Sequence, residues 1–248
     1  MSALLPPLDY PLPIFTPSTV QCTRFYSGAS IHSLKKNDDS IFFSNIKRYQ
    51  IDINNKKVES KSKSIKYDHP KIKLKNRKEE TFSCLDEQLA ENIQKRLPPR
   101  IGVSSEWRLC YSLDQHGASF STLYDTVNNQ GPCLLVIQDT NDEIFGAYLS
   151  EGIQLQPSCY GTGECFLWKK DKNTSDITVY PWTSSNDYIV YSTSEFLAIG
   201  GGQGRFGLWL HSDLTHGYTE PCATFNNPCL TSNPAFTCLD VEVWSFHY

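Results

Sequence analysis

The stretch that decides the fold runs from residue 160 to residue 210 and contains YGTGECFLW (160–168), YPWTSSNDYIVY (180–191) and FLAIGGGQGRFGLWL (196–210). It holds ten aromatic residues and seven glycines. Large rings fill the interior of a sheet, and glycines permit the tight turns between strands. The stretch therefore predicts a compact antiparallel sheet core. Its polar residues do not assemble into a catalytic set.

Short apolar runs separated by turn residues continue on both sides of this stretch. A hairpin turn is expected from Asp139 to Asp142. In the last run, strict alternation places Leu239, Val241, Val243 and Ser245 on one face and Asp240, Glu242, Trp244 and Phe246 on the other. The expected strands are 107–111, 133–139, 143–149, 165–169, 177–182, 187–193, 196–200, 206–210 and 236–246.

Two helices are expected, and both precede most of the strands. Ser83 is the expected N-cap of the first, which carries an apolar stripe and ends at Pro98 and Pro99. The stripe consists of Leu85, Leu89, Ile93 and Leu97. The second helix is expected from Ser119 to Val127. Many short strands and few helices predict an α+β fold that is mainly β, a two-layer antiparallel β-sandwich with a few peripheral helices.

Charge divides the chain into two parts. Residues 1–80 hold 15 Lys and Arg against 8 Asp and Glu, whereas residues 81–248 hold 8 against 19. We expect a basic arm over 1–80, Pro-rich at first and then rich in Lys, Asn and Ser, which is largely disordered or docks on a surface. Within it, 40–53 is the exception, and it is expected to form a strand or a docking segment. A folded acidic domain is expected over 81–248, and its charge argues against nucleic-acid binding by the domain itself.

The nine cysteines form no C-x-x-C pair and lie mostly in apolar runs. They are typical of small buried hydrophobic residues in a reducing compartment, and no spacing fits a zinc site. No run approaches 18 continuous apolar residues, and the N-terminus does not have the pattern of a secretory leader. We therefore expect a soluble intracellular monomer with no metal and no cofactor.

One glycine motif, from Gly202 to Gly207, formally matches G-x-G-x-x-G. A dinucleotide site would need a helix to follow, but the strand-like FGLWL follows instead. The motif is therefore interpreted as a turn between strands. Four glycines in a short space would leave the backbone exposed, so that a partner can approach closely; they are Gly200, Gly201, Gly202 and Gly204.

A nucleophilic set can be drawn from Cys165, His116 and Glu164, but nothing in the sequence brings the three together. A neighbouring carboxylate would raise the pKa of the Cys165 thiol and so make it less reactive. We expect Cys165 to be a core-facing strand residue. Cys165 and Cys222 are nevertheless the two thiols to test if the chain acts by redox chemistry.

Eight ordered motifs together resemble the TLDc domain family of the oxidation resistance proteins, fungal members in particular. They are WRLCYSLDQHGASFSTLY (107–124), GPCLLVIQD (131–139), IFGAYLSEG (144–152), YGTGECFLW (160–168), YPWTSSNDY (180–188), FLAIGGGQGRFGLWL (196–210), DLTHGYTEPCATFNN (213–227) and LDVEVWSF (239–246). The resemblance covers essentially all of 81–248. It implies a two-sheet sandwich, protection against oxidative stress, no enzymatic activity, and binding to the vacuolar-type proton-pumping ATPase.

Three hypotheses for function follow. The first is a non-enzymatic regulator that binds cytosolic subunits of the proton pump near its peripheral stalk, in the cytoplasm or at the vacuolar membrane, with a mitochondrial pool as a further compartment. The second is a thiol-based redox sensor or peroxide scavenger. The third is an adaptor for membranes or nucleic acid that acts through the basic arm. For the first, the surfaces to test are the four glycines together with His211, Asp213 and His216.

Overall fold

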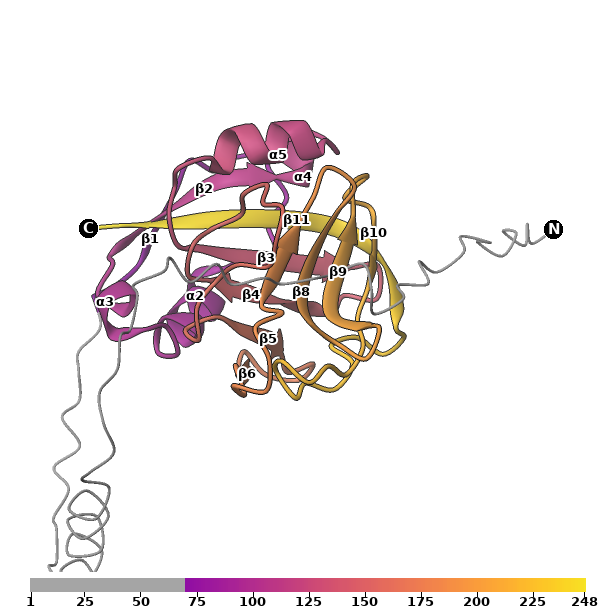
Figure 1. Ribbon diagram of the computed structural model, residues 1–248. Coiled ribbons are helices and arrows are strands. Elements are labelled where there is room, and N and C mark those ends of the chain that lie inside the picture. The colour runs from indigo at the N-terminus through magenta and orange to yellow at the C-terminus, as the bar shows by residue number, and fades with distance from the viewer. Residues whose placement is uncertain (1–69) are drawn as a thin grey trace, which may run out of the picture. The chain divides into compact units, whose positions relative to one another are not determined.

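The computed structural model describes residues 70–248 (Figure 1). The Pro-rich segment and the segment 40–53, for which we considered a docking role, lie outside the described residues. The described residues form more strand than helix, and nearly all strand pairs are antiparallel. The expected α+β, mainly β sandwich is confirmed.

Within the described residues, eleven strands form one hydrogen-bonded network that folds into two layers. The strand order is β6-β5-β4-β3-β11-β10-β9-β8-β7, and β2 pairs with both β11 and β1. The long strand β11 is shared, because it pairs with β2 and β3 in one layer and with β10 in the other. The strands are β1 (Lys73–Lys75), β2 (Glu106–Ser112), β3 (Cys133–Asp139), β4 (Ile144–Leu149), β5 (Phe166–Lys170), β6 (Ile177–Pro181), β7 (Val190–Ser192), β8 (Phe196–Gly202), β9 (Arg205–His211), β10 (His216–Tyr218) and β11 (Ala235–His247).

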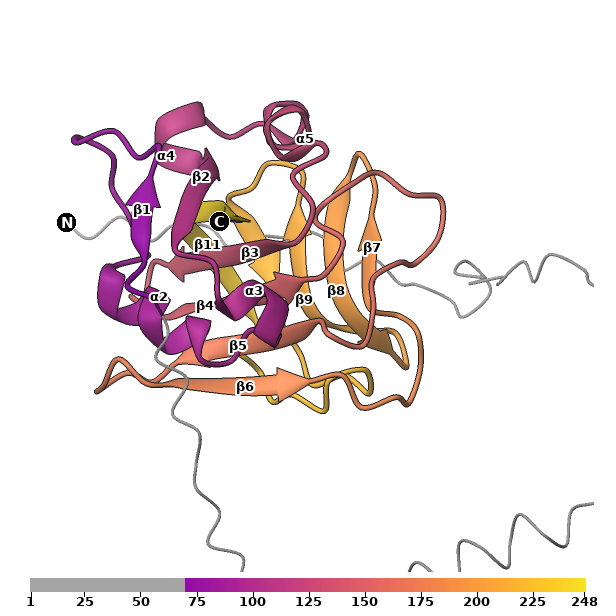
Figure 2. The same cartoon turned by 90° about the vertical axis from the view of Figure 1, so that its left-hand side faces the viewer.

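Two apolar clusters lie on opposite faces of the layer formed by β2 to β5. The first fills the space between the two layers and includes Leu135, Leu167, Leu208 and Val243. The second lies between the outer face of this layer and the helices α2 (Glu87–Gln94) and α3 (Pro99–Gly102), which cross in front of β4 and β5 in Figure 2. Because both faces are covered, strands such as β3 are apolar along nearly their whole length.

The first helix begins later than the sequence suggested. Its N-cap is Asp86, whose Oδ1 accepts a hydrogen bond from the backbone N–H of Leu89 at 2.6 Å. Ser83, the expected N-cap, instead accepts a hydrogen bond from Arg77 at 2.7 Å. The helix also ends at Gln94, before the two prolines, and Pro99 opens the short helix α3. A proline is well placed there, because the first turn of a helix does not use its N–H.

Removing the Asp86 carboxylate should therefore destabilise the fold. We expect Asp86→Ala to lower the free energy of unfolding by about 1 kcal/mol, because an N–H of the first helical turn loses its acceptor. Asp86→Asn keeps an acceptor at the same place and should cost only a few tenths of that. Chemical denaturation of the two variants measures the difference, and equal losses would contradict this assignment of the cap.

The second expected helix is confirmed as α5 (Phe120–Val127), capped by the Ser119 side chain. Its buried residues Phe120, Leu123 and Val127 join the cluster between the layers and close one end of the sandwich. The single turn α4 (Leu113–His116) precedes it and was not predicted. Figure 1 shows both elements beside β2.

Three details of the strands differ from the expected pattern. A register shift between Cys238 and Asp240 leaves Leu239 exposed, so Leu239 does not share a face with Val241 and Val243. The strand β10 was not predicted because its residues, HGY, do not form an apolar run. The strand β1 falls at the end of the basic arm, which was expected to be largely disordered or to dock on a surface, and it pairs in parallel with β2. The expected domain boundary at residue 81 stays a prediction.

Candidate functional site

The turn between β8 and β9 is a tight hairpin. Gly202 pairs with Arg205, which leaves Gln203 and Gly204 as the connecting residues. Both have positive φ, 54° and 76°. Two consecutive positive φ values define the turn that matches the twist of a β-hairpin, and glycine accepts this backbone without steric cost. The G-x-G-x-x-G sequence is therefore a strand connection, as interpreted.

The glycines before this turn are not equally accessible. Gly200 and Gly201, which were expected to leave backbone exposed, are buried, whereas Gly204 is exposed and Gly202 is intermediate. A Cβ on Gly200 would lie 2.6 Å from Phe225 and 2.8 Å from the Cys222 sulfur. Its φ of 72° also favours glycine. Gly200 is thus required for close packing, and only the hairpin end of this segment can meet a partner.

A second candidate feature is the turn after β9, where two histidines share one carboxylate. The Asp213 Oδ2 lies 3.0 Å from Nδ1 of His211 and 2.8 Å from Nδ1 of His216. Its Oδ1 accepts hydrogen bonds from the backbone N–H of Thr215 and of His216. Burial alone would raise the pKa of Asp213, but these hydrogen bonds outweigh it and hold the pKa below its usual range. The three side chains are partly exposed.

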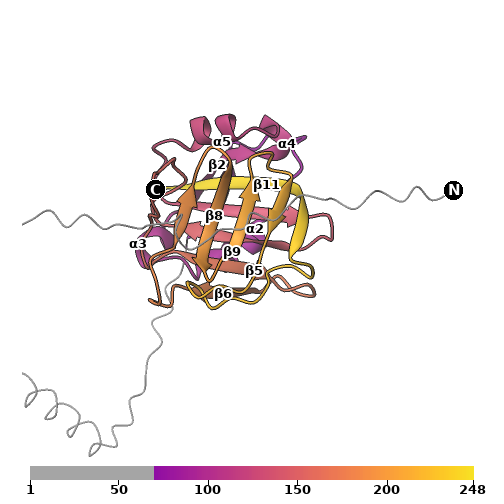
Figure 3. The same cartoon turned by 45° about the vertical axis from the view of Figure 1, so that its right-hand side comes forward.

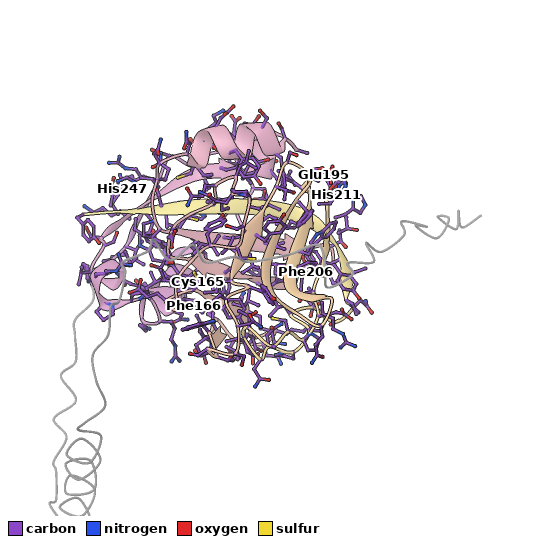
Figure 4. The ribbon with its side chains drawn as sticks, viewed as in Figure 1. Cys165, Phe166, Glu195, Phe206, His211 and His247 are labelled. Carbon is purple, nitrogen blue, oxygen red and sulfur yellow. The ribbon has the colours of Figure 1, made fainter. Side chains whose placement is uncertain are left out.

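The two features do not form one site. The hairpin turn and the His211 turn lie at opposite ends of β9, which at about 3.3 Å per residue places them roughly 20 Å apart. Figure 4 shows His211 beside Glu195 at one end, with Phe206 lower on the same strand. Their role in binding a partner stays a prediction, and each surface has to be tested separately.

The two candidate thiols lie inside the sandwich. The Cys165 sulfur is 3.3 Å from both the backbone nitrogen and the hydroxyl of Ser150, and the Cys222 sulfur is 3.2 Å from the Asn227 side-chain oxygen. Both residues are buried, and burial raises the pKa of each thiol. Cys165 is a core residue, as expected, but it precedes β5 instead of lying in the strand. A buried thiol with a raised pKa is a poor nucleophile at neutral pH.

We expect Cys165 and Cys222 to resist mild oxidation in the folded protein. At neutral pH each should react with hydrogen peroxide or iodoacetamide at least tenfold more slowly than the same cysteine in the chain unfolded in urea. Mass-spectrometric mapping of all cysteines gives the rates. The partly exposed Cys229 serves as the internal reference. Rapid modification of Cys165 or Cys222 in the native state would favour the redox hypothesis instead.

The nucleophilic set drawn from the sequence is not assembled. The His116 ring stacks on Tyr111 and lies within hydrogen-bonding distance of the Ser112 backbone. Glu164 forms an ion pair with Arg100. Among residues 70–248, no hydrogen bond or ion pair joins any two of His116, Glu164 and Cys165.

A buried cluster of acids was not predicted. Asp240 and Glu242 are both fully buried on β11, and their carboxylates lie with the Cys84 sulfur in a group whose ligand atoms are all within 4.8 Å. One oxygen of Glu242 accepts the Trp244 indole N–H at 2.9 Å. The other Glu242 oxygen and Oδ2 of Asp240 have no hydrogen-bond partner. The sequence did carry a signal, because alternation placed both acids on the face that holds Trp244 and Phe246.

The cluster is better suited to hold a proton than a metal ion. Thiolate and carboxylates can bind a divalent cation only when they are deprotonated. Here burial raises the pKa of all three groups, that of Asp240 to about 6, and the Glu242 charge raises the pKa of Asp240 further. A proton between the two facing carboxyl groups removes one charge and supplies the donor that they lack.

Among the residues that the structure describes, no helix is long and apolar enough to cross a membrane.

Comparison with known proteins identifies one family. The model of the TLDc domain matches residues 78–247. The chain is 40% identical over 166 residues to Oxidation resistance protein 1 of Yarrowia lipolytica. The aligned region covers 63% of this chain and 71% of that protein. It is 34% identical over 225 residues to Oxidation resistance protein 1 of Kluyveromyces lactis, covering 77% and 90%. It is also 42% identical over 165 residues to Nuclear receptor coactivator 7 of Gallus gallus, covering 66% of this chain but only 18% of that longer protein.

Proposed function

The chain belongs to the TLDc domain family, and from this premise we propose that it protects cells against oxidative stress as a non-enzymatic protein that binds the vacuolar-type proton-pumping ATPase and regulates its assembly or activity. The observation that carries the proposal is the match of the TLDc model across the described domain, together with fungal relatives named oxidation resistance protein. The pump is the finer part of the proposal and follows from the family resemblance.

The arrangement of the domain supports binding rather than thiol chemistry. The two thiols favoured by the redox hypothesis are buried, and their pKa values are raised by burial. The accessible features are instead turns held in fixed shape, the hairpin at Gln203 and Gly204 and the Asp213 turn. A surface that is already rigid loses little conformational entropy when a partner binds.

Recovery of pump subunits from cell extract tests the proposal. The tagged full chain should enrich cytosolic pump subunits, read by mass spectrometry, under conditions that keep the pump assembled or that disassemble it. Gln203→Glu puts a charge on the hairpin, and His211→Ala removes one histidine from the Asp213 turn. If either surface binds the pump, its variant should lose at least fivefold in enrichment.

Lys95→Ala is the matched control, because Lys95 is an exposed residue that follows α2 on the far side of the domain. It should leave the enrichment unchanged. Failure of the unaltered chain to enrich any pump subunit in either state would contradict the proposal. Enrichment that all three variants retain would leave pump binding intact and exclude both surfaces.

A further inference from the structure

An irregular segment covers the buried acids Asp240 and Glu242. We call it the strap; it consists of residues 76–86, between β1 and α2. Glu242 pairs with Val136, a residue of the second apolar cluster, so its side chain lies on the outer face of the layer. The strap brings Cys84 to this place, where its sulfur lies within 4.8 Å of an oxygen of each acid.

Hydrogen bonds to side chains of α4 hold the strap in place. Oε1 of Gln115 accepts the backbone N–H of Lys78 at 3.1 Å, and Oδ2 of Asp114 accepts that of Phe82 at 3.0 Å. Figure 3 shows α4 above β11, at the same end of the sandwich as α5. Both contacts are exposed to solvent, where a hydrogen bond contributes only about 1 kcal/mol.

Paired strands close other sides of the acids. At Glu242, β11 pairs with Ser112 of β2 and with Val136 of β3. Reaching the carboxylates from these sides would break ladders of backbone hydrogen bonds. The strap contains neither helix nor strand, so water reaches the acids at least cost when the strap is displaced.

Two oxygen atoms make the closed strap sensitive to charge. Oδ2 of Asp240 and Oε1 of Glu242 are buried, and neither has a hydrogen-bond partner in the structure of residues 70–248. When both groups are ionised, each of these oxygens needs a donor, and the two charges repel each other. A shared proton meets both needs while the strap is closed, and water meets them once it opens.

The groups around Asp240 do not neutralise a second charge. The titratable groups that face it are acids, a phenol and thiols, and within residues 70–248 no ion pair involves either Asp240 or Glu242. These groups are Glu242 and Cys238 on β11, Asp114 on α4, Tyr111 on β2 and Cys84 on the strap. The Asp114 backbone N–H donates to Oδ1 of Asp240 at 3.3 Å, but it leaves Oδ2 without a donor.

We propose that the strap is a pH-dependent cover, which stays closed while Asp240 and Glu242 share a proton and opens more often when both are ionised. Opening admits water to the two carboxylates and exposes the Cys84 thiol, while the paired strands remain intact. This device does not depend on the proton pump.

The direction of the pH dependence follows from burial. Burial and the Glu242 charge raise the pKa of Asp240 to about 6 in the closed state, whereas a hydrated aspartate has a pKa of about 4. The closed state therefore binds the proton more tightly and is favoured at low pH. This advantage is lost as the pH rises from about 4 to about 6, so opening becomes more frequent over that window.

Hydrogen exchange of the Lys78 backbone N–H tests this in the full chain. Its acceptor is the neutral Gln115, so this hydrogen bond does not itself titrate. After correction for the intrinsic rate, its protection should fall at least tenfold between pH 4 and pH 7. The N–H of Leu135, in the middle of β3, reports global unfolding and should be far more strongly protected at every pH.

Two variants separate the acid pair from other titrating groups. Asp240→Asn removes the ionisable group and should abolish most of the pH dependence at Lys78. Asp125→Asn is the matched control, because Asp125 is exposed on α5, and it should keep the full dependence. Circular dichroism shows whether each variant is folded.

Three results would overturn the proposal. One is protection of the Lys78 N–H that does not change with pH in the unaltered chain. Another is equal protection of Lys78 and Leu135, because the strap would then open only when the whole domain unfolds. The third is a full pH dependence that persists in folded Asp240→Asn.

Discussion

Gly146→Ala should lower the free energy of unfolding by about 3 kcal/mol or more. For a domain of ordinary stability this is a large part of the total free energy of unfolding. Gly146 is buried in the middle of β4, where it pairs with Val136 on one side and with Trp168 on the other. A Cβ at this position would lie 1.9 Å from the carbonyl oxygen of Leu135 and 3.3 Å from the Trp168 ring. The first contact is with backbone, so the strands themselves would have to separate.

Gly117→Ala is the matched comparison for this effect. Gly117 has a φ of 78°, but a Cβ there would meet nothing within 4 Å. Its ψ of 166° places the backbone in a region that is essentially confined to glycine, so only this conformational cost applies, about 1 to 3 kcal/mol. Urea denaturation of the two variants separates a steric from a conformational cost. If Gly146→Ala were no more destabilising than Gly117→Ala, the close approach of β3 to β4 would be wrong.

Asp240→Asn should stabilise the protein by about 2 kcal/mol at pH 7.5, although it changes a fully buried residue. Burial and the neighbouring Glu242 raise the pKa of Asp240 to about 6, well above its value in an unfolded chain. Above pH 6 Asp240 is therefore a buried carboxylate ion in the folded state. In the unfolded chain the same carboxylate is hydrated, so its charge does not oppose unfolding. Asparagine is neutral, and its amide group can donate to the free oxygen of Glu242.

The sign of the pH dependence follows from the same shift. The folded protein binds a proton at Asp240 more tightly than the unfolded chain does, so this carboxyl group favours folding at low pH. The advantage is lost as the pH rises from about 4 to about 6, and the unfolding free energy of the unaltered protein should fall over that window. In Asp240→Asn this fall should be smaller, and the gain in stability should vanish near pH 4.

Thermal or urea unfolding measured between pH 4 and 8 checks this prediction. Asp125→Asn is the control, because Asp125 is exposed on α5 and its substitution should alter neither the stability nor its pH dependence by more than a few tenths of a kcal/mol. Lower stability of Asp240→Asn at pH 7.5 would contradict an unfavourable carboxylate charge at Asp240 and would favour a bound cation between Asp240, Glu242 and Cys84.

The strands could be predicted because their signal is local. The aromatic and glycine-rich motifs after residue 160 placed β5, β7, β8 and β9 to within a few residues, and Ser119 correctly marked the start of α5. The prediction of Ser83 as the N-cap was wrong because Ser83 and Asp86, three residues apart, can both cap a helix, and tertiary contacts decide which of them does. Ser83 accepts a hydrogen bond from Arg77, and no local sequence pattern reveals this contact.

The remaining errors share a physical reason. Alternation has a period of two, so it cannot show the bulge that turns Leu239 outward. The number of glycines does not show whether a glycine leaves its backbone exposed or packs closely against a neighbouring ring. Gly200 is of the second kind, because it packs against Phe225. Cys84 lies close to Asp240 and Glu242 in the structure, although more than 150 positions separate it from them in the sequence, so no local pattern could predict the cluster. The sequence could only indicate that two acids share a face with aromatic residues.

We propose that the domain acts by binding the proton pump rather than by chemistry of its own. A protein shifts an assembly equilibrium only by the difference in its affinity for the two states. The most direct measurement is therefore the dissociation constant of the full chain for the purified vacuolar pump, once assembled and once with its cytosolic part released. We expect affinities that differ at least tenfold. Equal affinity for both forms, or no binding to either, would contradict the account.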